Sequence, residues 1–285
     1  MKKDFCFIVP SYCSSDLHLH QLRRCLSSIR KHHENKIFII DDYSDKDVKP
    51  ISLEFDNIEI VESPVKAAGD MVTYSFFLEN KNFQKAVIFQ DSMNLETALV
   101  DIDKIENISH IWFFTNHRLH WSHIKEPKTE YNINNNINVH DDLILNCIDK
   151  MIDKEDFKIW LKDIYHQKDK WAGNIGCQSI VDHDFLVELN NKTGIVELMK
   201  KMNNNRLRRV AESLFPLACQ YVVGDDIVGK SYDGIYYDGV NSQSGKRKYQ
   251  AKELGIGTSS EVVEQVCKNT YFSKATFNRR PVKTN

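Results

Sequence analysis

The chain has 285 residues, of which 41% are hydrophobic and 27% are charged, so it is long enough to bury a sizeable core. Its formal net charge of -2 provides no overall positive field of the kind that recruits nucleic acid, although local basic clusters remain. The composition therefore favours one large α/β domain that works on small molecules, and we expect no nucleic-acid partner.

The cysteines and the N-terminus indicate the expected compartment. The seven cysteines are scattered, mostly within apolar runs, and lack the paired short spacing of zinc sites. They are predicted to be reduced core residues, which favours a cytoplasmic location. The first apolar run is short and is interrupted by Pro10, as in a strand rather than a signal peptide, and no stretch approaches eighteen apolar residues. We therefore expect no membrane span.

The first half of the chain alternates between two kinds of pattern. Short apolar runs typical of buried strands occupy residues 5–9, 36–40, 58–61, 86–89 and 111–114. A helix is predicted between the first two, because apolar residues recur three and four apart after cap-capable residues, in Ser15, Asp16, Leu19, Leu22, Leu26 and Ile29. Residues 71–78 and the series Leu95, Leu99 and Ile102 have the same period. This alternation predicts an open, mostly parallel sheet flanked by helices.

The second half is expected to be helical and rich in loops. Residues 131–138 are Asn-rich and aperiodic, as in a surface loop. Helical spacing follows in Phe157, Trp160, Leu161 and Ile164, and again in Leu207, Val210, Ala211 and Leu214. From Gly224 onward, glycine, tyrosine and lysine alternate quickly, which is typical of a mobile, ligand-responsive loop.

Polar residues follow the first two predicted strands, at the edge where open sheets bind ligands. Pro10, Ser11 and Tyr12 follow the first strand, and the pair Asp41 and Asp42 follows the second. A tyrosine ring can lie against a base, and a carboxylate can accept hydrogen bonds from a base N–H or from ribose. The alternative is that the acids only form a turn and its cap. Because a GxGxxG motif and a P-loop are both missing, dinucleotide enzymes and phosphate-loop ATPases become unfavoured.

The runs IVPSY, IIDDYSD and FQDSM, spanning residues 5–93, resemble the start of GT-A-fold glycosyltransferases of the family-2-like kind, which use nucleotide-diphosphate sugars. The segment WAGNIGCQSIVDHDFL is similar, more loosely, to the acceptor side of such enzymes. The whole chain also resembles glycosyltransferase-like proteins of large DNA viruses, which implies the host cytoplasm as the location. The resemblance implies one GT-A-like domain over 1–285, with a nucleotide-sugar-binding half (1–130), a mainly helical acceptor-side half (131–223) and a mobile C-terminal loop and helix (224–285).

The resemblance also implies an activity and the residues that bind the donor. The activity is transfer of a sugar from a nucleotide-diphosphate donor, expected to be a UDP-sugar, to a hydroxyl of a glycan, protein or lipid. Pro10, Tyr12 and Asp42 match residues that hold the nucleoside, with Asp41 close behind. Lys66 matches a region that approaches base or phosphate, and its alternative is an exposed loop lysine.

The metal motif of the family is incomplete in this chain. Members carry an Asp-x-Asp element whose acids bind ribose and a divalent cation on the diphosphate. Here Asp91 keeps the first position, but Met93 stands at the second, and a thioether is a poor ligand for Mg²⁺ or Mn²⁺. No histidine follows His183, so the C-terminal histidine ligand of many members is missing too. A divalent cation is therefore a doubtful cofactor, with Asp91 as its remaining ligand.

Basic side chains could neutralise the diphosphate instead. The candidates for such a clamp are Lys246, Arg247 and Lys248, with Arg279 and Arg280 near the end of the chain. The alternative is a solvated basic face, as for most charge runs.

The acceptor side offers several candidates for a general base, which an inverting transfer requires within hydrogen-bond reach of the acceptor hydroxyl. They are Asp182, Asp184, Glu212 and the cluster His140, Asp141 and Asp142. Each has a structural alternative, because Asp182 or Asp184 and the cluster each precede a helical run as a cap would, and Glu212 could pair with a nearby arginine.

Small residues and an indole could form the sugar-binding wall. Trp171, Gly173, Asn174 and Gly176 match the acceptor-side segment, with a tight turn around a buried tryptophan as the alternative. His117 and Trp121 could also line the cleft, although a lone histidine is more often structural.

Two rival functions remain open. A catalytically inactive nucleotide- or sugar-binding scaffold would keep the fold without the metal site. A nucleotidyltransferase is disfavoured, because the segment SYCSSDLHLH after the first strand lacks the basic, glycine-rich loop that such enzymes need.

Overall fold

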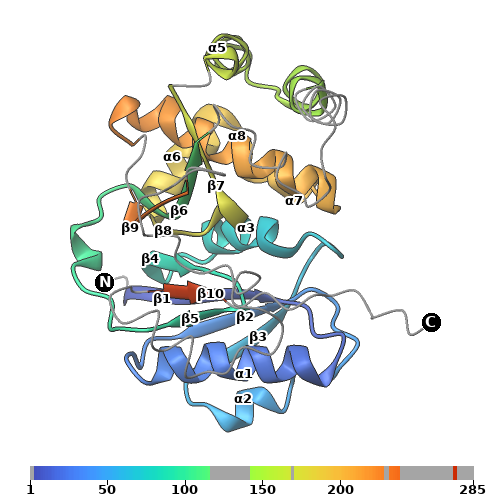
Figure 1. The fold of residues 1–285 in the computed structure, drawn as a ribbon, viewed down its shortest axis with the longest axis vertical. Helices are drawn as coiled ribbons and strands as arrows, with labels where there is room; N and C mark the ends of the chain where they lie inside the picture. The colour runs from blue at the N-terminus through green and yellow to red at the C-terminus, as the bar shows by residue number, and fades with distance from the viewer. Residues whose placement is uncertain (1–2, 116–141, 168–169, 228–230, 238–271, 275–285) are drawn as a thin grey trace, which may run out of the picture.

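The computed structural model describes residues 3–115, 142–167, 170–227, 231–237 and 272–274 (Figure 1). The strands are β1 Lys3–Ser11, β2 Ile37–Asp41, β3 Ile58–Glu62, β4 Phe83–Ile88, β5 Met93–Leu95, β6 Ile108–Thr115, β7 Ala172–Asn174, β8 Ser179–Asp182, β9 Ser231–Tyr237 and β10 Phe272–Lys274. The α-helices are α1 Asp16–Arg30, α2 Ile51–Glu54, α3 Val72–Glu79, α5 Glu155–His166, α6 His183–Thr193, α7 Ile195–Lys200 and α8 Asn205–Val223, with a further helix over 142–151. Short 3-10 turns are η1 Gly69–Met71, η2 Ile102–Lys104, η4 Ile175–Cys177 and η5 Asp225–Ile227.

One mixed sheet organises the described part of the chain. Its strand order is β3-β2-β1-β4-β8-β6-β7, with β9 also paired to β6. Strands β1 to β4, β6 and β9 run in one direction, and β7 and β8 run in the other. The prediction of an open, mostly parallel sheet flanked by helices is therefore confirmed.

Helices cover both faces of this sheet, as the continuous apolar strands require. Figure 1 shows α1 and α2 on one side, and α3, α6, α7 and α8 on the other. Alternate residues of β1 enter different hydrophobic clusters: Phe7 and Val9 pack with Leu22 of α1, whereas Ile8 packs with Phe215 of α8 and its neighbours. The sheet thus separates two cores, and its strand ends stay available for a site.

The predicted start of α1 is confirmed in atomic detail. The side chain of Ser15 accepts a hydrogen bond from the backbone N–H of His18, which caps the first turn. Leu22, Leu26 and Ile29 form the buried face of the helix. In the second half of the chain, Asn204 caps α8 in the same way, by accepting from the backbone N–H groups of residues 206 and 207.

Two sequence-based predictions of local structure were wrong, and two strands were not predicted. The series Leu95, Leu99 and Ile102 does not form a helix: β5 pairs with β10, and Asp101 adopts a left-handed conformation with φ 57° before η2. Strands β7 and β8 were not predicted from the sequence, because their buried runs of three and four residues are too short to reveal a period. Residues 231–237 were predicted as a loop, but they join the sheet beside β6 as β9.

Two expectations from composition can be compared with the described residues. The six cysteines among them are all buried and free, while Cys267 lies outside the described range. None of the helices in this part of the chain is both long and apolar enough to cross a membrane.

Candidate functional site

A cavity of about 590 Å³ opens at the carboxyl ends of β1, β2 and β4. The strand ends and the turns after them contribute Pro10, Ser11, Tyr12, Asp42, Gln90, Asp91 and Ser92. The loop leading into α3 contributes Lys66, Ala67, Gly69, Asp70 and Met71, and α8 contributes Arg208, Arg209 and Glu212. This is the edge at which open α/β sheets bind their ligands. The predicted donor residues Pro10, Tyr12, Asp42, Lys66 and Asp91 all line this cavity.

Asp42 fixes the loop that forms one wall of the cavity. Its Oδ1 accepts a hydrogen bond of 2.7 Å from the backbone N–H of Ala67, and its Oδ2 accepts one of 3.0 Å from that of Gly69. The side chain is only 7% exposed. Burial raises the pKa of the Asp42 carboxyl above its ordinary value, although both backbone donors and the charge of Arg208 act in the opposite direction. Asp42 therefore has a structural role in the cavity wall and is also a candidate residue for binding a ligand.

The adjacent acid has a different position. Asp41 does not line the cavity, and its Oδ1 accepts a hydrogen bond of 3.2 Å from the backbone N–H of Ser44. Successive side chains of a strand point to opposite faces, so only one acid of this pair can face the cavity. Asp41 thus follows the alternative interpretation of the sequence, in which it only stabilises the turn after β2.

Aromatic and basic side chains lie together near the end of β1. The hydroxyl of Tyr12 donates to Oδ2 of Asp45 at 2.9 Å, which holds the ring in place. The ammonium group of Lys66 lies 5.8 Å from the ring centroid of Tyr43. Tyr12 and Lys66 therefore bring an aromatic ring and a positive charge to the cavity, whereas Tyr43 is not among the residues that line it.

Asp91 is anchored at the base of the cavity, whereas Met93 lies outside it. The hydroxyl of Ser11 donates to Oδ2 of Asp91 at 2.9 Å. Met93 is 0% exposed and packs in the hydrophobic cluster that contains Phe89 and Leu95. The side chain at the second position of the predicted motif therefore points into the core and does not line the cavity.

Glu212 reaches the cavity from α8 and is held by the backbone of η4. Its Oε1 accepts a hydrogen bond of 2.9 Å from the N–H of Gly176. Gly176 has φ +63°, and a Cβ at this position would lie 2.8 Å from Nε2 of Gln90 and 2.6 Å from Nε2 of Gln178. The positive φ favours glycine here, and the N–H of Gly176 orients Glu212. The close approach of this backbone to a sugar stays a prediction.

Two polar residues of the cavity floor were not singled out from the sequence. Gln90 Nε2 donates a hydrogen bond to Oδ2 of Asp70, which links the turn after β4 to η1. Asp70 follows no predicted strand, so the rule about strand ends could not have found it. Gln90 directly precedes Asp91, and its place in the motif was the available signal.

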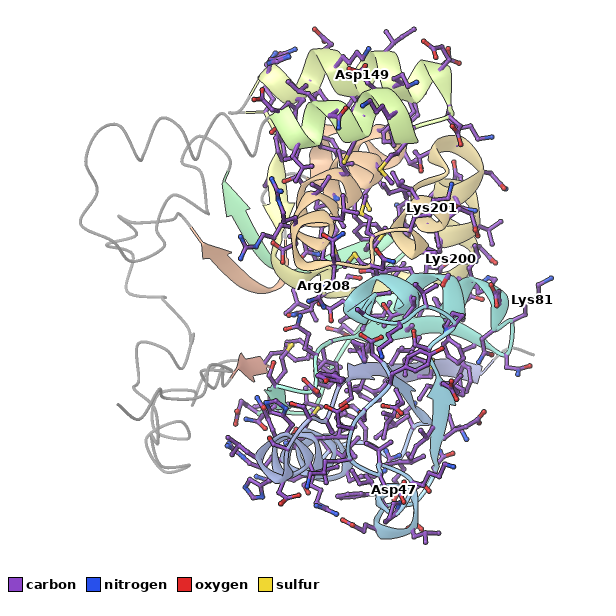
Figure 2. All side chains as sticks on the ribbon, turned by 90° about the vertical axis from the view of Figure 1, so that its right-hand side faces the viewer. Asp47, Lys81, Asp149, Lys200, Lys201 and Arg208 are labelled. Atoms are coloured by element: carbon purple, nitrogen blue, oxygen red, sulfur yellow. The ribbon has the colours of Figure 1, made fainter. Side chains whose placement is uncertain are left out.

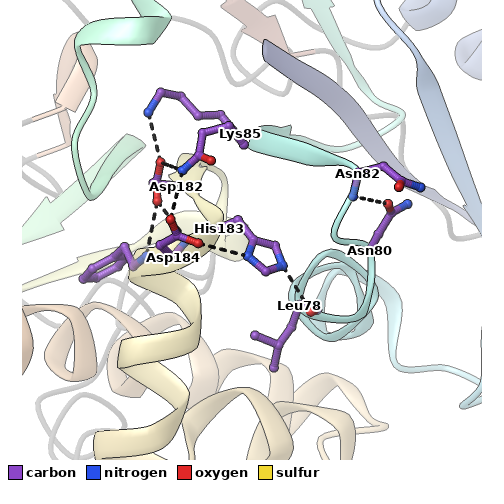
Figure 3. A network of polar contacts seen from close by, with 9 residues as sticks. Leu78, Asn80, Asn82, Lys85, Asp182, His183 and Asp184 are labelled. Atoms are coloured by element: carbon purple, nitrogen blue, oxygen red, sulfur yellow. Dashed lines mark hydrogen bonds and ion pairs between the residues drawn. The ribbon is translucent and has the colours of Figure 1, made fainter. Parts of the chain in front are cut away.

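Asp182 and Asp184 lie near the amino end of β4, away from the strand ends that form the cavity. Asp182 pairs in register with Lys85 near the start of β4, whereas the cavity lies beyond the end of that strand. Oδ1 of Asp182 accepts from the backbone N–H of Asp184 and Phe185, so Asp182 is the cap of α6. Oδ2 accepts from the ammonium of Lys85 at 3.0 Å (Figure 3). The structure does not bring either acid to the cavity as a base.

The same network ties α6 to the end of α3. Ring nitrogens of His183 lie 3.2 Å from the carbonyl oxygen of Leu78 and 3.6 Å from Oδ1 of Asp184 (Figure 3). His183 is buried, whereas Asp184 is exposed. These contacts join two helices on one face of the sheet, which accounts for the polar residues at this point.

The predicted sugar-binding wall is largely part of the core. Trp171 is 3% exposed, and its indole N–H donates to the carbonyl of Tyr165 at 3.3 Å. Asn174 is buried, and its Nδ2 lies 2.7 Å from Nδ1 of His110 and 3.0 Å from the carbonyl of Gln178. Neither they nor Gly173 line the cavity. Gly176, the remaining member of this predicted wall, donates its backbone N–H to Glu212, which lines the cavity.

Several candidates lie outside the described residues. They are the predicted clamp Lys246, Arg247 and Lys248, the pair Arg279 and Arg280, and His117, Trp121, His140 and Asp141. Asp142 is the first residue of the helix over 142–151 and is exposed.

No protein-family model and no curated protein matches the chain. Among solved structures, S. aureus TarS 1–349 in complex with UDP is similar at 13% identity and a TM-score of 0.39, over 73% of this chain and 53% of that one. The same protein in complex with UDP-GlcNAc is similar at 18% identity and a TM-score of 0.32, over 44% of this chain and 37% of that one. A 4-diphosphocytidyl-2C-methyl-D-erythritol synthase from Anaerococcus prevotii is similar at 16% identity and a TM-score of 0.32, over 40% and 56%. The chain thus spans between 37% and 56% of the length of these structures.

Proposed function

We propose that this protein is a glycosyltransferase that moves a sugar from a nucleotide-diphosphate donor, preferably a UDP-sugar, to a hydroxyl of a glycan, protein or lipid. One observation carries the proposal: the same cavity at the strand ends combines the aromatic ring of Tyr12, two arginines and the carboxylate of Glu212, which a backbone N–H orients. These groups suit, in turn, a nucleoside, a diphosphate and an acceptor hydroxyl. A volume of about 590 Å³ also lies within the usual range for small-molecule sites.

Glu212 is the proposed general base. In an inverting transfer, the acceptor oxygen attacks the anomeric carbon, the bond from that carbon to the β-phosphate oxygen breaks, and the hydroxyl proton passes to the base. The backbone N–H of Gly176 holds one carboxylate oxygen of Glu212 and so fixes the direction of the side chain. Asp182 and Asp184 lie near the amino end of β4 and do not line the cavity, which supports the choice of Glu212 among the three acids.

The proposal separates binding from chemistry, and two variants test that separation. We expect Asp42→Ala to weaken binding of the preferred nucleotide about tenfold or more, because the loop over 66–69 loses both of its hydrogen-bond acceptors. We expect Glu212→Gln to bind that nucleotide within about twofold of the original protein, but to lose about 10²- to 10⁴-fold in turnover. Asp47→Ala, in an exposed turn after β2, is the matched control and should change neither.

The measurements are calorimetric titrations with UDP, GDP and CDP and with their sugars, followed by an assay for nucleotide release with and without acceptor sugars. Binding without turnover under every condition would favour the scaffold alternative. If no nucleotide or nucleotide sugar binds, the proposal is overturned.

A further inference from the structure

The cavity carries two arginines from α8 close to its acids. Arg208 and Arg209 precede Glu212 by four and three residues, so one face of the helix presents all three to the same cavity. In Figure 2, Arg208 lies where the helices of the C-terminal half meet the N-terminal half. We refer to Arg208 and Arg209 as the arginine pair.

The backbone of η1 is shaped to admit Arg208. A Cβ at Gly69 would lie 3.5 Å from Cζ of Arg208 and would overlap its Nη1. Gly69 also donates its N–H to Asp42, so the guanidinium passes directly over the loop that Asp42 fixes. Arg208 is thus placed by packing against backbone.

The side chains of the cavity do not form the Asp-x-Asp pair that the resemblance implies for a cation on the diphosphate. At nucleotide sites Mg²⁺ is bound by one or two carboxylates together with phosphate oxygens and waters, so the orientation of the few acids present decides whether it is held. Asp91 accepts from Ser11, Asp70 accepts from Gln90, and Met93 lies in the core. Within the described ranges, no three side chains of His, Cys, Asp or Glu gather in a metal-binding arrangement. The resemblance to cation-dependent enzymes therefore does not extend to the side chains that would have to bind the cation.

We propose that the arginine pair replaces the divalent cation: it binds the diphosphate of the donor and stabilises the leaving nucleotide. This inference rests on the proposed function. When the bond from the anomeric carbon to the β-phosphate oxygen breaks, its electron pair stays on that oxygen, and the guanidinium groups offset the new charge. Arginine suits this task because its planar fork of donors matches phosphate oxygens. Transfer then proceeds without added metal.

The test compares ligands that differ only in phosphate. Titrations use UDP, UMP and uridine, or the corresponding series for whichever diphosphate binds best, with the purified full chain in EDTA and again in Mn²⁺. We expect EDTA to change the affinity for the diphosphate by less than about twofold. Arg208→Gln and Arg209→Gln should each weaken diphosphate binding roughly 10- to 150-fold, the loss of one charge-assisted hydrogen bond, and leave nucleoside binding nearly unchanged.

Two further variants separate the proposed role from a general effect of removing positive charge. Arg206→Gln removes a charge from an exposed position on the same helix and should leave every affinity unchanged. Arg208→Lys keeps the charge but lacks the fork, so its diphosphate affinity should lie between those of the original protein and Arg208→Gln. Melting temperatures establish that each variant is folded.

Failure of this inference can be told apart from failure of the proposed function. If EDTA abolishes diphosphate binding while the nucleoside still binds, or if the arginine variants weaken uridine as much as UDP, the arginine pair does not replace a cation. If no nucleoside or nucleotide binds under any condition, the proposed function fails as well.

Discussion

His110 gives a prediction about stability that does not depend on the identity of any ligand. The ring lies on β6, is 0% exposed and packs 6.0 Å from the ring of Phe215. Its Nδ1 accepts a hydrogen bond of 2.7 Å from Nδ2 of Asn174, whose other N–H is directed to the carbonyl of Gln178. Protonation of Nδ1 would place two donors against each other in a dry interior. Burial lowers the pKa of His110 from 6.5 to about 3.

The sign and size of the change in stability with pH follow from the difference between the pKa of His110 in the folded and in the unfolded state. Because the folded pKa lies below that of the unfolded chain, the unfolded state takes up the proton first as pH falls. The stability that neutral His110 contributes is therefore complete above pH 6.5 and is lost progressively toward pH 3. A histidine that stays neutral when folded lowers the free energy of unfolding by about 2 kcal/mol on going from neutral pH to about pH 5.

Urea unfolding at about pH 7.5 and about pH 5 measures this loss. In His110→Gln the side-chain oxygen can still accept from Asn174, but the residue cannot titrate, so the difference between the two pH values should shrink by about 2 kcal/mol. The matched control is His166→Gln, which removes an exposed histidine of α5 and should leave the difference unchanged. If His110→Gln keeps the full pH difference of the original protein, the argument about Nδ1 is refuted.

Three further predictions concern other contacts of the site and its supports. Tyr74→Phe removes a fully buried hydroxyl that bonds to β8 and to the turn before it, and urea titration should show a loss of about 1–3 kcal/mol; an unchanged midpoint would contradict this. Asp182→Asn leaves the ammonium of Lys85 buried without its charge partner and should cost about 3 kcal/mol of stability, while calorimetry finds nucleotide affinity retained; a loss of turnover in the folded variant would restore this acid as a catalyst. Gly69→Ala forces a side chain into φ +56° against Arg208, so we expect a loss of about 1–2 kcal/mol in unfolding experiments and weaker diphosphate binding, and tight binding with full stability would argue against the packing described.

The part of the cavity formed by the strand ends could be predicted from the sequence, because its residues directly follow apolar runs that are recognisable locally. Tyr12, Asp42 and Asp91 directly follow apolar strands, and parallel strands end at the same edge of a sheet. The choice between Asp41 and Asp42 needed the pleat of β2, which decides which acid faces the cavity.

The part of the cavity formed by α8 depends on strand pairings between distant parts of the chain, which no local sequence pattern reveals. Arg208 and Arg209 lie more than a hundred residues after Asp91, and their position is set by β8, which inserts between β4 and β6 and carries α6 and α8 behind it. Their helical spacing from Glu212 predicted only an ion pair with that residue. Asp182 illustrates the reverse case, because its local signature as a helix cap was the correct interpretation.

The orientation of Met93 decides what an acidic side chain at this position could do. An aspartate placed here would lie among Phe89, Leu95 and Phe272, so it would cost several kcal/mol of stability and would add no acid to the cavity. It could reach the cavity only if β5 and its partner β10 were repacked. Engineering a two-acid cation site into this protein therefore means redesigning a strand pair, whereas changing the charge of the cavity needs only substitutions at residues that already line it.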